Sequence, residues 1–512
     1  MRKKNYLIKP MLCIAFVFCS LLSVAQSKKE RQASERATNT TFLNPILGGD
    51  FPDPTIMRDG KDYYMTHSSM YYVPGLLVFH STDLVNWEPI SNALNTYIAS
   101  VWAPDMCKFK DKFYIYFTVA GKGNFVVYAN SPNGPWSEPV DLKLEGIDPG
   151  HVVDDKGQRW VFMNGGYRAK LTEDGLAVVP GSLEKVYDGW EYPIEWETDG
   201  FNLEGPKLKK IGDYYYLLAA QGGTAGPPTS HMIIVARSKS IDGPWENAPN
   251  NPLIRTWQNS EKWWAKGHGS LIDTPDGKWW VVYHAYENGF LGMGRQTLIE
   301  LVEINEQGWL VAPSGIAMEG PMPKPIKSEI SINRLEHLNE FRIGFDWKFF
   351  RNYDPERVLF KDGVLTMSAK GLAPSESAPM LFVPGVQNYE ISAKIAIDST
   401  AVGGLVLFYN EDFYVGTGID TQKRIRWRKG DVRGTWAHEG GTQMWLKIRT
   451  IDHIVTGYYS YDGIDWKKEI WGMDISGYHH NTLYGFIGVL PGLFAYGEGE
   501  VRFSDFEFKI LE

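Results

Sequence analysis

Carboxylic acids recur at related positions in the first 312 residues, and such groups can accept or donate protons. Asp53, Asp105, Asp148 and Glu204 lie 9 to 12 residues before aromatic residues that mark predicted strands, and His268 lies 12 residues before a fifth marker. Proline or glycine adjoins each of these residues, and both types control the backbone where a strand begins. Clustered acids repel one another and raise some of their pKa values, which suits general acid–base chemistry.

Asp beside Pro is also common in turns, so each residue taken alone is explained simply by turn chemistry. A purely structural ring would have little reason to hold repelling charges together. We therefore predict functional roles for Asp53, Asp148 and Glu204. Asp105 is offset from the others, and we expect it to bind substrate or to support its neighbours through hydrogen bonds.

A five-fold repeat must position these residues. Each unit contains an apolar strand, a turn rich in Gly, Asp or Lys, and an aromatic strand. The last aromatic residues of successive units are separated by 50, 46, 55 and 65 residues, which suits four-stranded propeller blades with variable loops. The first strand of each blade lines the axis of a propeller, so side chains at equivalent strand starts converge there. The five markers are Tyr64, Tyr114, Trp160, Tyr215 and Trp280.

The predicted fold class is all-β, with a five-bladed β-propeller over residues 43–312 followed by a second β domain. The alternative is that aromatic hairpins recur by chance in a chain rich in Trp and Tyr. Four prolines between residues 313 and 325 make that stretch unsuited to central strands or helices. We expect a Pro-rich linker over residues 313–328.

Residues 329–512 show the patterns of an antiparallel β-sandwich, which we expect to be jelly-roll-like. Apolar and polar residues alternate over residues 389–395, and Asp462-Gly463 is a hairpin signal. This domain could bind polysaccharide, stabilise the propeller or complete a pocket. Phe494 and Tyr496 are candidate surface aromatics for the last role.

The N-terminus has the features of an export signal. Basic residues at positions 2 to 9 precede an apolar stretch from Met11 to Val24, and the small residues Ser23 and Ala25 stand just before Gln26. We interpret residues 1–25 as a cleaved signal peptide, because the stretch is short for a membrane anchor. We therefore expect a secreted, periplasmic protein without a transmembrane segment in the mature chain.

Composition excludes several partners. Loss of the signal would remove four basic residues and no acidic ones, which takes the formal net charge from −9 to −13. Such a charge disfavours phosphate backbones and anionic membranes, so nucleic acid is not an expected partner. The mature chain would keep Cys107 as its one cysteine and could form no internal disulfide.

The ordered motifs around these residues resemble those of glycoside hydrolase family 43. The resemblance spans most of residues 43–312, and the C-terminal domain is similar to the concanavalin-like module of the family's arabinofuranosidases and xylosidases. The motifs are Asn44-Pro45-Ile46-Leu47, Phe51-Pro52-Asp53-Pro54, Trp102-Ala103-Pro104-Asp105, Ile147-Asp148-Pro149, Glu204-Gly205-Pro206-Lys207-Leu208, Gly267-His268-Gly269 and Gly294-Arg295-Gln296.

This resemblance implies a role for each carboxyl group. Asp53 would be the general base that activates water, and Glu204 the general acid that protonates the glycosidic oxygen. Asp148 would raise the pKa of Glu204 and hold it in place. An inverting enzyme needs its two carboxyl groups about 6.5–9.5 Å apart, with water between them.

The resemblance also implies secondary site residues. Trp102 would form an apolar wall against a sugar face, and Arg295 would reach sugar hydroxyls, with Asp105 as a further substrate-binding candidate. His268 is a candidate metal ligand. We expect no required cofactor, and at most a structural Ca²⁺ on the propeller axis. The segment 222–231 is expected to lie at the pocket rim.

The expected activity is that of a non-reducing-end exo-α-L-arabinofuranosidase, with β-xylosidase as an additional activity, on plant cell-wall polysaccharides or oligosaccharides. A β-D-xylosidase is the first alternative, because arabinofuranose and xylopyranose have similar shapes. A non-catalytic carbohydrate-binding propeller is the second. A structural surface protein would not explain the shared repeat positions of the three acids.

Overall fold

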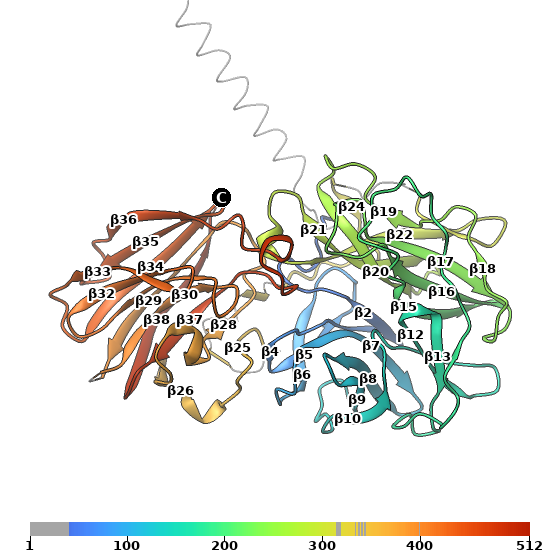
Figure 1. Ribbon diagram of the computed structural model, residues 1–512, viewed down its shortest axis with the longest axis horizontal. Helices are drawn as coiled ribbons and strands as arrows, with labels where there is room; N and C mark the ends of the chain where they lie inside the picture. The colour runs from blue at the N-terminus through green and yellow to red at the C-terminus, as the bar shows by residue number, and fades with distance from the viewer. Residues whose placement is uncertain are drawn as a thin grey trace, which may run out of the picture.

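The chain is all-β and consists of a propeller and a sandwich, as the computed structural model shows (Figure 1). The fold class predicted from the repeat is confirmed. The predicted signal peptide, residues 1–25, lies outside the described residues. Within the described part, no helix is long and apolar enough to cross a membrane. The described residues are 40–313, 319–332, 334–335, 338, 341–342, 345–398 and 400–511.

The propeller has five antiparallel blades, and the five aromatic markers all fall in second strands. Blade one contains β2 (Thr55–Asp59), β3 (Asp62–Thr66), β5 (Gly75–Ser81) and β6 (Glu88–Leu94), and blade two contains β7 (Val101–Phe109), β8 (Lys112–Val119), β9 (Gly123–Ala129) and β10 (Val140–Leu144). Blade three contains β11 (Gly150–Val153), β12 (Arg159–Met163), β13 (Tyr167–Lys170) and β14 (Glu184–Lys185). Blade four contains β15 (Glu204–Ile211), β16 (Tyr214–Gln221), β17 (Met232–Ser238), β18 (Glu246–Asn247) and β19 (Ile254–Arg255). Blade five contains β20 (Trp263–Asp273), β21 (Trp279–Glu287), β22 (Gln296–Ile304) and β23 (Leu310–Val311).

The first strands of the blades form a closed ring around the axis. Each of β2, β7, β11, β15 and β20 contacts the next, and β20 returns to β2. Because every blade has the same strand order, these inner strands all begin at one end of the axis. The residues that precede them therefore surround one mouth.

The N-terminal segment closes the propeller. The Asn44 side chain exchanges two 3.0 Å hydrogen bonds with the backbone of Ile299 in β22. Nearby, β1 (Thr41–Phe42) pairs with β24 (Met322–Pro323), which lies inside the expected linker. The two ends of the propeller domain are thereby held together.

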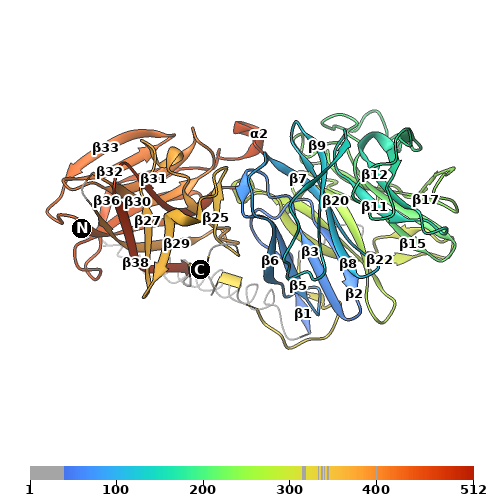
Figure 2. The same ribbon diagram turned by 90° about the horizontal axis from the view of Figure 1, so that it is seen from below.

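The sandwich packs a sheet of eight strands against one of seven. The first has the order β33 (Asp431–Ala437), β32 (Lys423–Arg428), β31 (Tyr414–Ile419), β30 (Val402–Phe408), β37 (Leu490–Tyr496), β28 (Met380–Leu381), β25 (Lys348–Phe350) and β4 (Tyr72–Val73). The second has the order β26 (Val358–Lys361), β27 (Val364–Ser368), β38 (Glu500–Ile510), β29 (Tyr389–Ile397), β34 (Gln443–Ile451), β35 (Ile454–Ser460) and β36 (Lys467–Asp474). A short helix, α2 (His480–Leu483), lies between the sandwich and the propeller (Figure 2).

One strand of the sandwich comes from the propeller. β4 belongs to blade one in sequence, yet it pairs with β25, with Tyr72 opposite Phe350 (Figure 1). A continuous hydrophobic core joins Phe51 and Phe79 of the propeller to Trp347 of the sandwich. The two domains therefore share one core, which fixes loops of the sandwich against the mouth of the propeller.

Candidate active site

Four residues from four blades meet at the mouth. Asp53 and Asp148 directly precede the inner strands of blades one and three, Glu204 begins β15, and His268 lies in β20. His268 contacts all three acids. Its Nδ1 lies 3.7 Å from Asp53 Oδ1, and its Nε2 lies 3.8 Å from Asp148 Oδ2 and 3.4 Å from Glu204 Oε1.

A recurrent backbone conformation turns these side chains toward one another. Asp53, Asp148 and His268 have φ values of 56°, 59° and 54°, in the left-handed region that most residues avoid. In blade four the left-handed residue is Gly205, at φ 57°, so Glu204 stands one position earlier than the other two acids. Such strain costs about 1–3 kcal/mol per residue and gathers at functional sites.

Asp53 is held in its ionised form. It accepts hydrogen bonds from Arg295 Nη1 at 2.8 Å and from Ser68 Oγ at 2.5 Å. Its backbone N–H donates to Nδ1 of His284 at 3.1 Å. Burial alone would raise the pKa of Asp53, but the positive charges of Arg295 and His268 hold that pKa well below its usual value. A buried, fixed carboxylate of this kind can act as a base.

Asp148 is the opposite case, a carboxyl group that favours its proton. Burial raises its pKa to about 7, opposed by His268 and reinforced by the negative charges of Glu204 and Asp53. Asp148 Oδ2 also accepts the backbone N–H of Gly205 at 3.1 Å, which ties blade three to the residue after Glu204. Asp148 thus positions the Glu204 backbone while its charge disfavours ionisation of both acids together.

Glu204 is the most accessible of the three acids. Its side chain is 20% exposed, whereas those of Asp53 and Asp148 are each 5% exposed. A group that gives a proton to a bound ligand must reach that ligand. The exposure of Glu204 therefore suits an acid and the burial of Asp53 suits a base acting through water.

His268 carries positive charge between the acids. Burial would lower its pKa, but Asp53, Glu204 and Asp148 raise it to about 9. Its ring lies 5.5 Å from that of His231 and 5.2 Å from that of His284. Burial lowers the pKa of both of these neighbours, so they remain neutral beside the charged ring.

Glu204, His231 and His268 also offer ligand atoms that all lie within 4.8 Å of one another. Two imidazoles and one carboxylate are a poor match for Ca²⁺, which takes six to eight oxygen ligands. The donor set therefore does not fit the calcium ion expected on the axis.

Arg295 presents unused hydrogen-bond donors to the site. Its side chain is 4% exposed, and its Nε and Nη2 atoms are buried without a partner among the described residues. Leaving such donors unpaired costs about 1–3 kcal/mol, which a bound hydroxyl group would offset. The expectation that Arg295 reaches sugar hydroxyls stays a prediction, because these two nitrogens are closed to solvent in the structure.

The sandwich supplies a wall of the same site. The ring of Phe486 lies 5.4 Å from the Arg295 guanidinium and stacks at 3.4 Å on His480 of α2. Asp50 fixes this arrangement, because Oδ1 accepts the backbone N–H of Arg295 at 3.2 Å and Oδ2 accepts that of Gly488 at 3.0 Å. One buried carboxyl group therefore connects propeller and sandwich beside the mouth.

The interpretation of Phe494 and Tyr496 as surface aromatics that complete the pocket is wrong for Phe494. Phe494 is fully buried, because β37 lies between β28 and β30 and turns this ring into the core against Trp427, 5.3 Å away. Tyr496 is half-buried and stacks on Phe494 at 6.1 Å. The sandwich reaches the site through Phe486 instead.

Asp105 and Trp102 do not join the carboxyl cluster. Asp105 accepts bonds from Thr55 Oγ1 at 3.1 Å and from the His151 backbone at 2.7 Å, and it pairs with Lys207 at 3.0 Å. These contacts belong to a separate cavity of about 220 Å³ farther along the inner strands. Trp102 is half-buried against the shared core and donates to Ser100 Oγ at 3.1 Å.

Four contributors to the site were not predicted as site residues. Ser68 and His284 lie in or beside second strands, where the repeat gave no signal for them, and Phe486 lies in the other domain. His231 closes the segment 222–231, which was expected at the pocket rim. A search of the repeat for polar residues on second strands could have found His284 in β21.

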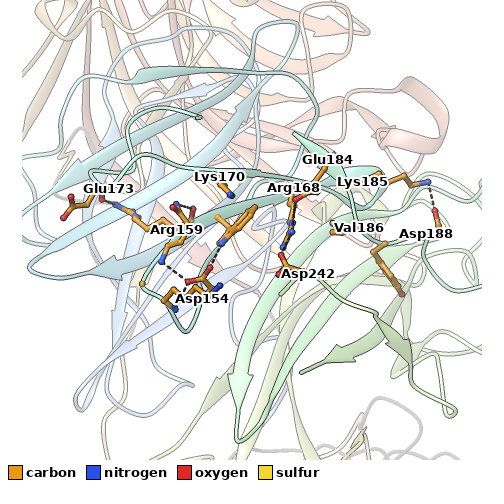
Figure 3. Close-up of a pocket in the computed structure, with 15 residues that line it drawn as sticks. Asp154, Arg159, Arg168, Lys170, Glu173, Glu184, Lys185, Val186, Asp188 and Asp242 are labelled. Atoms are coloured by element: carbon orange, nitrogen blue, oxygen red, sulfur yellow. Dashed lines mark hydrogen bonds and ion pairs between the residues drawn. The ribbon is translucent and has the colours of Figure 1, made fainter. Parts of the chain in front are cut away.

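A larger surface pocket lies away from the carboxyl cluster, on blade three (Figure 3). Its volume is about 1020 Å³. Arg168 stacks on Trp160 at 4.0 Å and forms ion pairs of 2.8 Å with Glu184 and 2.5 Å with Asp242. Arg168 is therefore neutralised by acids of the same pocket, and Asp53, Asp148 and Glu204 are not among the residues that line it.

Comparisons with known proteins agree with the geometry. The sequence profile described as Glycosyl hydrolases family 43 matches residues 42–310. The profile of the Beta xylosidase C-terminal Concanavalin A-like domain matches residues 336–509. Together these matches cover both structural domains.

Several relatives share most of their length with this chain. BoGH43B, a non-reducing end alpha-L-arabinofuranosidase of Bacteroides ovatus, is 33% identical over 70% of this chain and 74% of its own. A xylan 1,3-beta-xylosidase of Vibrio sp is 26% identical over 92% of this chain and 99% of its own. The crystal structure of the GH43 protein BlXynB from Bacillus licheniformis has a TM-score of 0.83 at 26% identity, covering 92% of this chain and all of that one.

The charges at the mouth predict the pH dependence of activity. Burial raises the pKa of Asp148 to about 7, so kcat/KM should fall as pH rises through about 7 and the carboxyl cluster loses the proton that Asp148 holds. Asp53 has a lowered pKa and stays ionised, so the acidic decline should lie below about pH 4. In Asp148→Asn the group with this raised pKa is gone, so the alkaline decline near pH 7 should disappear. An unchanged alkaline limb in that variant would contradict the coupling.

The bridge through Asp50 predicts a loss of activity from a buried residue outside the carboxyl cluster. Asp50→Ala leaves two backbone N–H groups unpaired and frees Arg295 and the Phe486 segment, so kcat/KM should fall about ten- to hundredfold. The matched control is Asp346→Ala, which removes a buried acid that pairs with Arg334. We would measure kcat/KM of both variants at a temperature where both are folded. Equal losses would show a stability effect only.

Proposed function

Because the chain belongs to glycosyl hydrolase family 43 and is a glycosidase of the xylosidase/arabinofuranosidase type, we propose that it is an inverting, exo-acting α-L-arabinofuranosidase that also accepts β-D-xylosides. The observation that carries this proposal is the contrast between Asp53 and the Asp148–Glu204 pair. Arg295 and His268 keep Asp53 ionised, while burial and the negative charges of Glu204 and Asp53 raise the pKa of Asp148 to about 7, so Asp148 holds a proton beside Glu204.

The reaction follows from this division. Asp53 accepts a proton from a water molecule, whose oxygen attacks the anomeric carbon of the terminal sugar. Glu204 gives its proton to the glycosidic oxygen as the bond to the leaving group breaks. Asp148 holds the backbone after Glu204 through Gly205 and so keeps the acid in place. General acid–base assistance of this kind contributes about 10²–10⁴-fold to the rate.

The position of His268 supports an inverting mechanism. Its ring lies between Asp53 and Glu204, with different ring nitrogens nearest the two carboxyl groups. An inverting site places its acid and base about 6.5–9.5 Å apart, whereas a retaining site places them about 5–5.5 Å apart. An imidazole interposed between the groups favours the wider spacing, with room for water.

The substrate class rests on the shape of the site and on the relatives. Arg295, which pairs with Asp53, lies 5.4 Å from the ring of Phe486, and we place the terminal sugar beside these two residues. The relatives include an arabinofuranosidase and a xylosidase. We place arabinofuranosides first, since BoGH43B has the higher identity, and plant-wall polysaccharides or oligosaccharides as the source.

The site of action and the cofactor requirement are part of the same proposal. The signal-like residues 1–25 support export, with the periplasm as the destination. The acid and base at the mouth account for hydrolysis without a metal, so no cofactor is proposed. A negative formal charge supports a neutral glycan rather than nucleic acid as the partner.

The role of Glu204 predicts a dependence on the leaving group. Glu204→Ala should abolish cleavage of natural arabinosides and xylosides, because their sugar leaving groups need protonation. The same variant should retain more activity on aryl glycosides with acidic phenols, which leave without a proton. Initial rates on the two substrate types measure the difference.

The matched control is Asp53→Asn, which removes the base and should reduce both activities alike. Equal losses in Glu204→Ala on both substrate types would count against Glu204 as the acid. Retained activity in Asp53→Asn would overturn the proposed base.

A further inference from the structure

An aromatic platform lies beside the mouth on the side of Glu204. It consists of Trp190, Tyr192, Trp196, Phe201 and Trp257, whose neighbouring ring centroids are 5.7 to 6.4 Å apart. Phe201 is 44% exposed and Trp257 is 45% exposed. Exposed aromatic rings gathered in one place mark binding surfaces more often than isolated ones do.

The connectivity of the propeller places this platform at the mouth. Residues 186–203 join β14 to β15, which begins at Glu204, so Phe201 stands three residues before the acid. Trp257 lies between β19 and β20, which carries His268. Segments that precede inner strands surround the mouth, because all inner strands begin at that end.

A second chain segment connects the platform to the catalytic groups. The backbone N–H of Asp199 donates to Ser230 Oγ at 2.7 Å, and that of Gly222 donates to Phe201 at 3.0 Å. The same 222–231 segment carries Thr224, whose hydroxyl lies 3.4 Å from His284 Nε2. The platform and the carboxyl cluster therefore share a supporting loop.

Contacts with neighbouring groups hold Trp196 and Tyr192 of the platform in place. The Arg255 guanidinium stacks on Trp196 at 3.6 Å, and its Nε donates to the backbone of Thr229 at 2.9 Å. Tyr192 is fixed by a 3.1 Å hydrogen bond to the backbone of Gly200. A preorganised surface loses little conformational entropy on binding.

The charge around the platform selects its ligand. Residues 188–203 contain five acidic side chains and no Lys or Arg, so the acids outnumber the Arg255 guanidinium that stacks on Trp196. The acidic residues are Asp188, Glu191, Glu195, Glu197 and Asp199. A polyanionic glycan would be repelled, whereas a neutral sugar ring has apolar C–H faces that pack on aromatic rings.

We propose that Phe201 and Trp257 form a binding site for the neutral glycan chain on the leaving-group side of the scissile bond. This proposal rests on the proposed function, because Glu204 protonates the oxygen that departs with that chain. Sugar units beyond the bond must leave the mouth next to Glu204, where the platform begins. The platform thus makes the enzyme favour the end of a longer neutral glycan over a small glycoside.

The test compares long and short leaving groups in Trp257→Ala and Phe201→Ala. The substrates are a neutral arabinoxylo-oligosaccharide and the methyl glycoside of the same terminal sugar. We expect the ratio of kcat/KM for the oligosaccharide to kcat/KM for the methyl glycoside to fall about tenfold, mainly through KM. Tyr461→Ala, an aromatic that is 41% exposed on the sandwich, is the matched control and should leave the ratio unchanged.

An unchanged ratio in both platform variants would overturn the proposal, and so would equal losses on both substrates. Calorimetric binding of the oligosaccharide to Asp53→Asn, with and without Trp257→Ala, tests the platform without turnover. Weaker binding in the double variant supports the platform, and equal binding overturns it. Failure of the wild-type protein to cleave either substrate would refute the proposed function, while the binding comparison would still decide the role of the platform.

Discussion

The ion pair between Arg295 and Asp53 is the interaction on which the arrangement of the site depends. Asp53 is buried, and burial alone would favour its neutral form, in which it could not activate water. The guanidinium at 2.8 Å reverses that preference. Arg295 is in turn placed by Asp50 through its backbone, and Asp50 also holds the sandwich at Gly488. The state of the base therefore depends on how the two domains meet.

Charge balance explains why one mouth can hold a base and an acid. Arg295 acts mainly on Asp53, while His268, with a pKa raised to about 9, touches all three acids. Asp148 is buried beside a second carboxyl group, so its proton is retained to about pH 7. Acid–base hydrolysis of a glycoside requires one carboxyl environment that favours the ionised form and another that favours the protonated form.

The repeat made the propeller and its three acids predictable, because rotational symmetry brings equivalent strand starts to one mouth. The same reasoning placed Asp105 near them, but its side chain lies along β7 and pairs with Lys207. Phe486, Asp50 and β4 could not be predicted in this way, since their roles arise from contact between the domains. The prediction for Phe494 failed for a related reason. The sequence of a strand does not show which face of the sheet an aromatic side chain occupies until the neighbouring strands are known.

The most direct test of the mechanism is the anomeric configuration of the sugar released in the first turnovers, followed by proton NMR before mutarotation. An interposed water between Asp53 and Glu204 requires one displacement at the anomeric carbon. An α-L-arabinofuranoside should therefore yield β-L-arabinofuranose, and a β-D-xyloside should yield α-D-xylose. Release of the sugar with its original configuration would contradict the account, because it would require a covalent intermediate and a closer pair of carboxyl groups.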